Sequence, residues 1–143
     1  MIKMKAIITA DSEMLDKRLL TILTGISGLE IIAGIKDVQE AFLFIKEFDP
    51  DILIISPNHL TSSFFEMLRD IRIQNDKLII IVLTENTSSE YSRMLENAGA
   101  NFVFDKALQL DRMIEVLCSL LYRKQYNAIA AENIISQTEK NHF

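Results

Sequence analysis

The chain of 143 residues is poor in the residue types on which several classes of site depend. Its single cysteine, Cys118, excludes an internal disulfide and a cysteine-based zinc cluster. The two histidines, His59 and His142, lie far apart and have no cysteine or acidic cluster at ligand spacing, so no metal site is expected. The four glycines form neither a GxGxxG nor a P-loop pattern, which leaves no nucleotide fingerprint.

The lack of a long apolar run and the negative net charge disfavour membrane spanning and nucleic-acid binding. No apolar run approaches the roughly 20 residues of a membrane span, and Met1–Lys5 leads into a strand without a signal-peptide layout. The net charge of −5 argues against a nucleic-acid surface, which is normally basic. An apolar content of 49% suits one domain with a hydrophobic core. We therefore expect a soluble cytoplasmic protein.

Short apolar, β-branched runs alternate with segments of helical periodicity. This alternation predicts an α/β fold of parallel βαβ units with right-handed crossovers, in a doubly wound five-stranded parallel sheet. The predicted strands cover Lys5–Ala10, Leu29–Ile35, Asp51–Ile55, Leu78–Leu83 and Asn101–Phe104. The predicted helices cover Ser12–Thr24 and Asp37–Phe48, the second with a capping box at Asp37/Glu40. Two further helices start with capping boxes at Ser63/Glu66 and Thr87/Glu90, and a third starts at Leu110.

Two of these strands, the third and the fourth, carry apolar residues throughout and are expected near the middle of the sheet. Ligands of such sheets bind outside the carboxyl ends of the strands. The residues expected at these ends are Ala10, Asp11, Ser56, Thr84, Glu85, Asp105 and Lys106.

The core is expected to end near Tyr122, which divides the chain into a domain of residues 1–122 and a helical tail of residues 123–143. The tail has no proline or glycine, and its apolar residues continue the stripe of the preceding helix. Cys118 lies in this stripe and is interpreted as a buried thiol. Such an extension either pairs with another chain or frays, and the sequence leaves both alternatives open.

Four segments at the strand ends, in this order along the chain, resemble the receiver domain of bacterial response regulators over about residues 4–122. The resemblance rests on the ordered set Lys5–Ser12, Pro50–Ser56, Ile81–Thr84 and Gly99–Lys106. It implies the flavodoxin-like fold with strand order 2-1-3-4-5. It also implies a site in which acidic residues hold Mg²⁺, an aspartate accepts a phosphoryl group, and a hydroxyl and a lysine bind its oxygens. Of these, the chain keeps Asp11, Thr84 and Lys106.

The departures from the family pattern fall at the positions that carry out phosphotransfer in the family. Ser56 stands at the phosphoacceptor position and Ala10 at the first acidic position, so the affinity for Mg²⁺ is expected to be weak or absent. Glu85 stands where the family prefers a small residue, Val103 where it has an aromatic switch residue, and Ala107 where it has a proline.

Ser56 is interpreted as a small polar residue with a local hydrogen bond, because a serine hydroxyl is a weak nucleophile without an activating base. Lys106 without a phosphoryl partner is expected to form an ion pair with Asp11 or with Glu85.

We consider three alternative functions for this chain. The first is a signal-transduction receiver without enzymatic activity that acts through protein–protein contact independently of phosphorylation. Its output surface would include Tyr91, Phe102, Arg112 and the tail, and the short tail is expected to leave no room for a DNA-binding domain. The second is a phosphorelay receiver that uses a non-standard acceptor. Asp51 is the only nearby carboxylate, but it opens the third predicted strand and is expected at the opposite end of the sheet from Lys106. The third is a small α/β enzyme or ligand-binding protein that uses Ser56, Thr84, Glu85 and Lys106.

Overall fold

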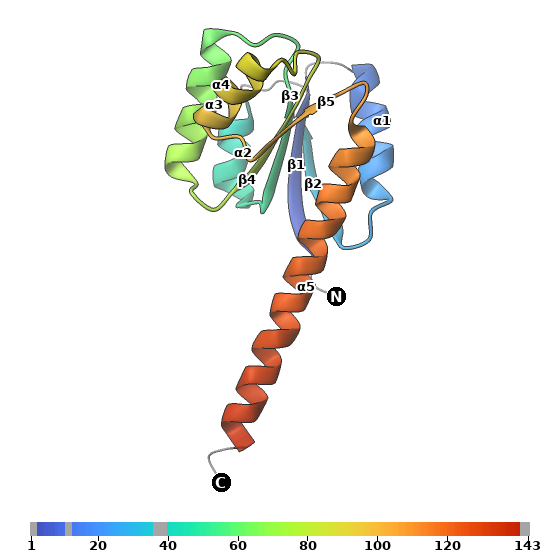
Figure 1. The fold of residues 1–143 in the computed structure, drawn as a ribbon, viewed down its shortest axis with the longest axis vertical. Coiled ribbons are helices and arrows are strands. Elements are labelled where there is room, and N and C mark those ends of the chain that lie inside the picture. Colours follow the sequence, from blue (N-terminus) through green and yellow to red (C-terminus); the bar gives the residue numbers. More distant parts are fainter. Residues whose placement is uncertain (1–2, 11–12, 36–39, 141–143) are drawn as a thin grey trace.

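The computed structural model describes residues 3–10, 13–35 and 40–140 (Figure 1). Five parallel strands form one sheet in the order β2-β1-β3-β4-β5, which confirms the doubly wound, flavodoxin-like fold. The strands are β1 (Met4–Ala10), β2 (Leu29–Ile35), β3 (Ile52–Ser56), β4 (Ile79–Thr84) and β5 (Phe102–Asp105). The helices are α1 (Glu13–Thr24), α2 (Ala41–Phe48), α3 (Ser62–Gln74), α4 (Ser89–Ala98) and α5 (Leu110–Lys140).

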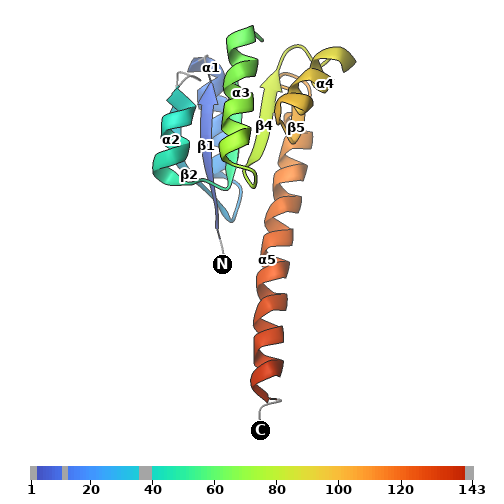
Figure 2. The ribbon, with the colours of Figure 1, turned by 90° about the vertical axis from the view of Figure 1, so that its left-hand side faces the viewer.

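The helices cover both faces of the sheet (Figures 1 and 2). One apolar cluster joins α2, α3 and α4 to one face through residues such as Ile45, Phe64 and Leu95. A second cluster joins α1 and α5 to the other face through residues such as Leu19 and Leu117. Because side chains of a strand alternate between the faces, β3 and β4 contribute to both clusters and are apolar along their whole length.

The predicted capping boxes of two helices are wrong by one or two residues. Helix α3 is capped by Thr61, whose side chain accepts a hydrogen bond from Phe64 N, and α4 is capped by Ser88, which accepts one from Tyr91 N. The capping box predicted at Asp37 lies outside the described residues. In both corrected cases a neighbouring hydroxyl fills the same role, since serine and threonine are both preferred N-cap residues.

Helix α5 has 31 residues and is therefore about 46 Å long. Its buried positions run from Leu110 to Leu121, and beyond them the helix projects past the sheet (Figures 1 and 2). The prediction of a buried Cys118 is wrong, because the thiol is exposed. Cys118 follows the buried Leu117 by one residue, which turns it about 100° away from the core.

Among the helices of the described ranges, none combines the length and the apolar character that crossing a membrane requires.

Candidate functional site

The carboxyl ends of the strands meet at one edge of the sheet, as predicted. The last residue of β3, Ser56, lies opposite Ala10 of β1 in the parallel ladder. The last residue of β4, Thr84, lies opposite Asp105 of β5. The backbone N–H of Lys106 then donates to the carbonyl oxygen of Thr84 at 3.1 Å, which fixes the start of the β5–α5 connection against β4.

Ser56 is buried, with 1% of its surface exposed. It follows Ile52 and Ile54 at alternate positions, so its side chain projects toward the face covered by α1 and α5. The predicted local hydrogen bond is wrong, since Ser56 Oγ has no hydrogen-bond partner in the described part of the chain. A buried hydroxyl without a partner costs about 1–3 kcal/mol of stability.

A second buried hydroxyl lies close by in β1, at a position that no sequence pattern singles out. Thr9 Oγ1 is also without a partner within the described ranges. Thr9 lies opposite Ile55, next to the Ala10–Ser56 pair. Threonine is common in strands, and only its burial at this edge marks it as unusual. The carboxyl edge therefore holds two hydroxyls that contribute no internal hydrogen bond.

Thr84 projects to the opposite face from Ser56, because it follows Ile80 and Val82 of the α3–α4 side at alternate positions. Its Oγ1 accepts a hydrogen bond from Asn86 N at 3.1 Å. The hydroxyl predicted to bind a phosphoryl group is thus engaged in holding the β4–α4 connection.

The predicted ion pair between Lys106 and Glu85 is confirmed as a contact. Lys106 Nζ lies 3.9 Å from Glu85 Oε1. The lysine side chain is only 12% exposed, whereas that of Glu85 is 80% exposed. The alternative partner, Asp11, lies outside the described residues. The carboxylate thus approaches a mostly covered ammonium group from the solvent side, which is a loose pair of modest energy.

The connection that follows β5 is organised by the side chain of Asp105. Asp105 Oδ1 accepts hydrogen bonds from the backbone N–H groups of Ala107 at 2.8 Å and Leu108 at 2.9 Å. Its own N–H donates to Gln109 Oε1 at 2.8 Å. A proline, which the receiver pattern has at position 107, could not donate the first of these bonds. Sequence reasoning noted Asp105 only as a strand end, although an aspartate that opens a turn signals such bonding.

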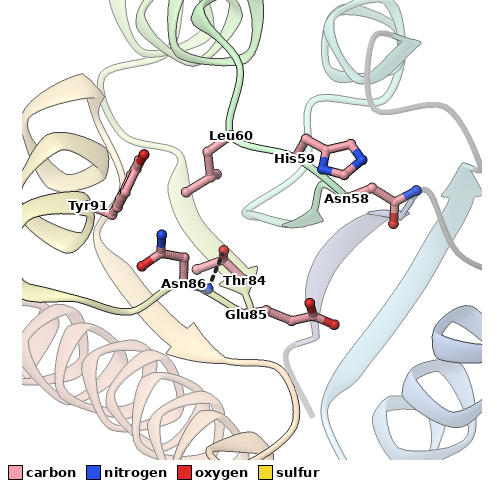
Figure 3. Close-up of a pocket in the computed structure, with 7 residues that line it drawn as sticks. All are labelled: Asn58, His59, Leu60, Thr84, Glu85, Asn86 and Tyr91. Carbon is pink, nitrogen blue, oxygen red and sulfur yellow. Dashed lines mark hydrogen bonds between the residues drawn. The ribbon is translucent and has the colours of Figure 1, made fainter.

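An open polar hollow lies between the β3–α3 and β4–α4 connections (Figure 3). It is lined by Asn58, His59, Leu60, Thr84, Glu85, Asn86 and Tyr91. Glu85 points away from Tyr91 in this view. Ser56 and Lys106 do not line the hollow in the described part of the chain, and Ser56 Oγ has no basic partner there. The arrangement thus supplies no Ser–Lys or Ser–Glu pair for nucleophilic catalysis.

Asp51, the acceptor in the second predicted function, lies at the opposite edge of the sheet. Its Oδ2 accepts a hydrogen bond from Lys5 N at 2.8 Å, and its Oδ1 lies 3.3 Å from Lys124 Nζ of α5. The five residues of β3, about 17 Å of extended chain, separate it from the carboxyl edge. Asp51 therefore tethers β1 and α5 and lies too far from Lys106 for a shared site.

Val103 is half-buried and packs against the α2–α3–α4 cluster. It therefore contributes apolar contact at the position where the receiver pattern has an aromatic switch residue. No group of three or more histidine, cysteine or acidic residues within the described ranges could hold a metal ion.

No protein-family model matches the chain. The chain is 25% identical over 136 residues to the "Probable C4-dicarboxylate response regulator DctR" of Bacillus subtilis (strain 168), which covers 94% of this chain. The chain spans 59% of the length of that curated relative.

Solved structures of receiver-containing proteins share the fold at low sequence identity. A two-component response regulator of the LuxR family from Aurantimonas sp. gives a TM-score of 0.74 at 19% identity, over 84% of this chain and 86% of that one. The receiver domain of Francisella response regulator 1452 gives 0.70 at 20% identity, over 86% and 99%. A DNA-binding response regulator of the LuxR family from Staphylococcus aureus gives 0.71 at 19% identity, over 82% and 98%. At these identities the likeness shows the fold alone.

Proposed function

We propose that the chain is a cytoplasmic receiver-type signalling module that accepts no phosphoryl group and acts through contact with a protein partner. The observation that carries this proposal is the side chain at the end of β3. In the described part of the chain, Ser56 is a buried hydroxyl without a hydrogen-bond partner, where phosphotransfer in a receiver needs a carboxylate. Since a neutral hydroxyl in this state is a poor nucleophile, the position is unsuited to accept a phosphoryl group from a phosphodonor.

The contact between Glu85 and Lys106 supports the same proposal. In a receiver the lysine at the end of the fifth strand responds to an added phosphoryl group. Here an anion that belongs to the chain itself lies 3.9 Å from Lys106 Nζ. Because this anion is present at all times, the lysine has a partner without any modification. We infer that Lys106 does not depend on a phosphoryl group for its partner and that signalling depends on what binds the module.

The groups at the carboxyl edge bear on whether the module could bind Mg²⁺. Mg²⁺ is normally bound by one or two carboxylates together with phosphate or water. In the described part of this edge, Glu85 is turned toward Lys106, and Ser56 Oγ is a neutral buried atom. These groups do not fit a magnesium site, so the proposed function uses no metal.

The partner is proposed to be a protein that contacts the side of the module formed by α4, β5 and α5. Receivers use this surface for output, and it carries Tyr91 and Phe102, both half-buried, in this chain. The net charge of −5 disfavours nucleic acid as the partner of this part of the chain.

Incubation of the chain with a small-molecule phosphodonor and Mg²⁺, followed by intact-mass measurement, tests the proposal. We expect no phosphoryl adduct on the wild-type chain. The matched positive control is Ala10→Asp/Ser56→Asp/Glu85→Ala, which restores two carboxylates and the small residue, and in which we expect one adduct. A stable adduct on the wild type would overturn the proposal.

A further inference from the structure

The projecting part of α5 exposes large apolar side chains on one face. Tyr122, Tyr126 and Ile129 are 72%, 62% and 58% exposed. Their spacing of four and three residues aligns them along one side of the helix, as at the contact seam between two packed helices. A stripe of this kind is typical of a helix that pairs with another helix.

The same side of α5 leads into an apolar groove where the helix leaves the domain. The groove lies between α5 and the connection from α1 to β2, and its volume is about 530 Å³. Its walls include Ile26 of that connection and Ile114, Cys118 and Leu121 of α5, together with Tyr122. Tyr122 therefore belongs both to the groove and to the exposed stripe, which makes the two continuous.

We propose that a second copy of this chain covers this surface, with the two α5 helices antiparallel about a twofold axis between Arg123 and Lys124. This arrangement brings Ile129 of each copy into the groove of the other, beside Cys118, and sets Tyr126 of each copy against Leu121 and Tyr122 of the other. The proposal deepens the proposed function, since it names a protein partner, and it makes no use of the phosphoacceptor position.

Shape selects the antiparallel orientation. The groove lies near the domain, whereas Tyr126 and Ile129 lie farther along the same helix. A parallel pair would set groove against groove and leave a void between the copies. An antiparallel pair sets protruding side chains into a groove twice, once in each direction, as a twofold interface requires.

The apolar area is sufficient for a specific dimer. Each of the two tyrosines exposes on the order of 130 Å², given that an aromatic side chain can bury about 150–250 Å². Together with Ile129, the groove and the adjoining helix surface, counted on both copies, the buried total is on the order of 1,000 Å², where specific interfaces begin. A second copy supplies both a stripe and a groove at matching spacing.

Light scattering on the full chain tests the pairing. We expect the mass of a dimer for the wild type and a rise of at least about thirty-fold in the dissociation constant for Ile129→Glu, which puts a charge into the groove. The matched control is Ile135→Glu, because Ile135 is 59% exposed on the same helix but lies about 120° away from Ile129. A monomeric wild type, or an equal loss in both variants, would overturn the proposal.

Disulfide formation tests the orientation, since Cys118 is the sole cysteine. In the antiparallel pair, the two copies of residue 118 lie roughly 16 Å apart along the axis, too far for a disulfide. We therefore expect no cross-link in the wild type, a cross-linked dimer in Ile129→Cys, and none in Cys118→Ser/Ile129→Cys. Cross-linking of the wild type or of the double variant would show a parallel pair.

Circular dichroism verifies that each variant keeps its helix content. A monomeric wild type refutes the pairing alone, whereas a phosphoryl adduct refutes the proposed function alone.

Discussion

The two edges of the sheet treat polar groups in opposite ways. At the amino edge Arg72 of α3 donates hydrogen bonds to the carbonyl oxygens of Gly99 at 2.6 and 3.0 Å and Leu78 at 2.7 Å, and to Asn101 Oδ1 at 2.6 Å. The same Asn101 oxygen also accepts a bond from Ile80 N. Burial lowers the pKa of Arg72, while the charge of Asp76 acts in the opposite direction. These hydrogen bonds form a dense network at the amino edge, which holds α3, β4 and β5 together.

The carboxyl edge lacks such a network around Thr9 and Ser56 in the described part of the chain. There the hydroxyls of both residues are buried without partners, and Glu85 lies mostly in solvent. The amino edge thus stabilises the fold, whereas the carboxyl edge leaves polar groups unpaired, as the proposed loss of a receiver site would explain.

The largest expected effect comes from Gly99→Ala at the amino edge. Gly99 has φ +125°, and an added Cβ would lie 2.7 Å from Arg72 Cβ. Backbone strain and the clash together are expected to lower the free energy of unfolding by about 3 kcal/mol in urea denaturation. The control is Gly25→Ala, whose added Cβ would meet its nearest atom at 3.4 Å. Equal stability of both variants would show that the amino edge is not rigid.

Arg72→Lys is expected to cost about 2 kcal/mol of unfolding free energy. A single ammonium group cannot reach the carbonyl oxygens of both the α3–β4 and the α4–β5 connection, so some of these oxygens lose their hydrogen bonds. The control is Arg69→Lys, an exposed change on the same helix that should leave stability within about 0.5 kcal/mol. If the two variants melt together in thermal denaturation, the network contributes little.

At the carboxyl edge, Ser56→Ala is expected to leave stability unchanged or to raise it by about 1 kcal/mol, because it removes an unpaired buried hydroxyl. Thr9→Val, which replaces the other such hydroxyl with a methyl group, should act in the same direction. Urea denaturation measures both effects. A loss above about 1 kcal/mol in either variant would mean that the hydroxyl has a partner after all.

The smallest effect is expected from Glu85→Gln. The carboxylate is 80% exposed and lies at the limit of an ion pair, so its loss should change the unfolding free energy by less than about 0.5 kcal/mol. The change should shrink further at high salt, because exposed charges are screened. A salt-independent loss larger than this would indicate that Glu85 is held in place more firmly than its exposure suggests.

Much of the fold could be predicted from the sequence. The apolar runs of the strands and the period of the helices gave every element, and the resemblance implied the strand order. The boundaries shifted by one or two residues: β3 begins at Ile52, directly after Asp51, and α4 is capped by Ser88. The site was predicted less completely. The contact of Lys106 with Glu85 followed from charge, and the turn organised by Asp105 is local enough for an aspartate at a turn to signal it. The burial of Thr9 Oγ1 without a partner in the described part of the chain depends instead on neighbours that are distant in the sequence.

The sequence by itself determined that position 56 holds a serine, that a lysine remains at position 106, and that apolar residues continue along the last helix. Local periodicity and residue type are enough for such conclusions. Only the tertiary structure decided that Ser56 Oγ is buried without a partner among the described residues, that Thr84 faces the other side of the sheet, and that Cys118 and Tyr122 border an apolar groove. These properties depend on which strands and helices become neighbours, and burial and pairing are set by neighbours and not by the residue alone.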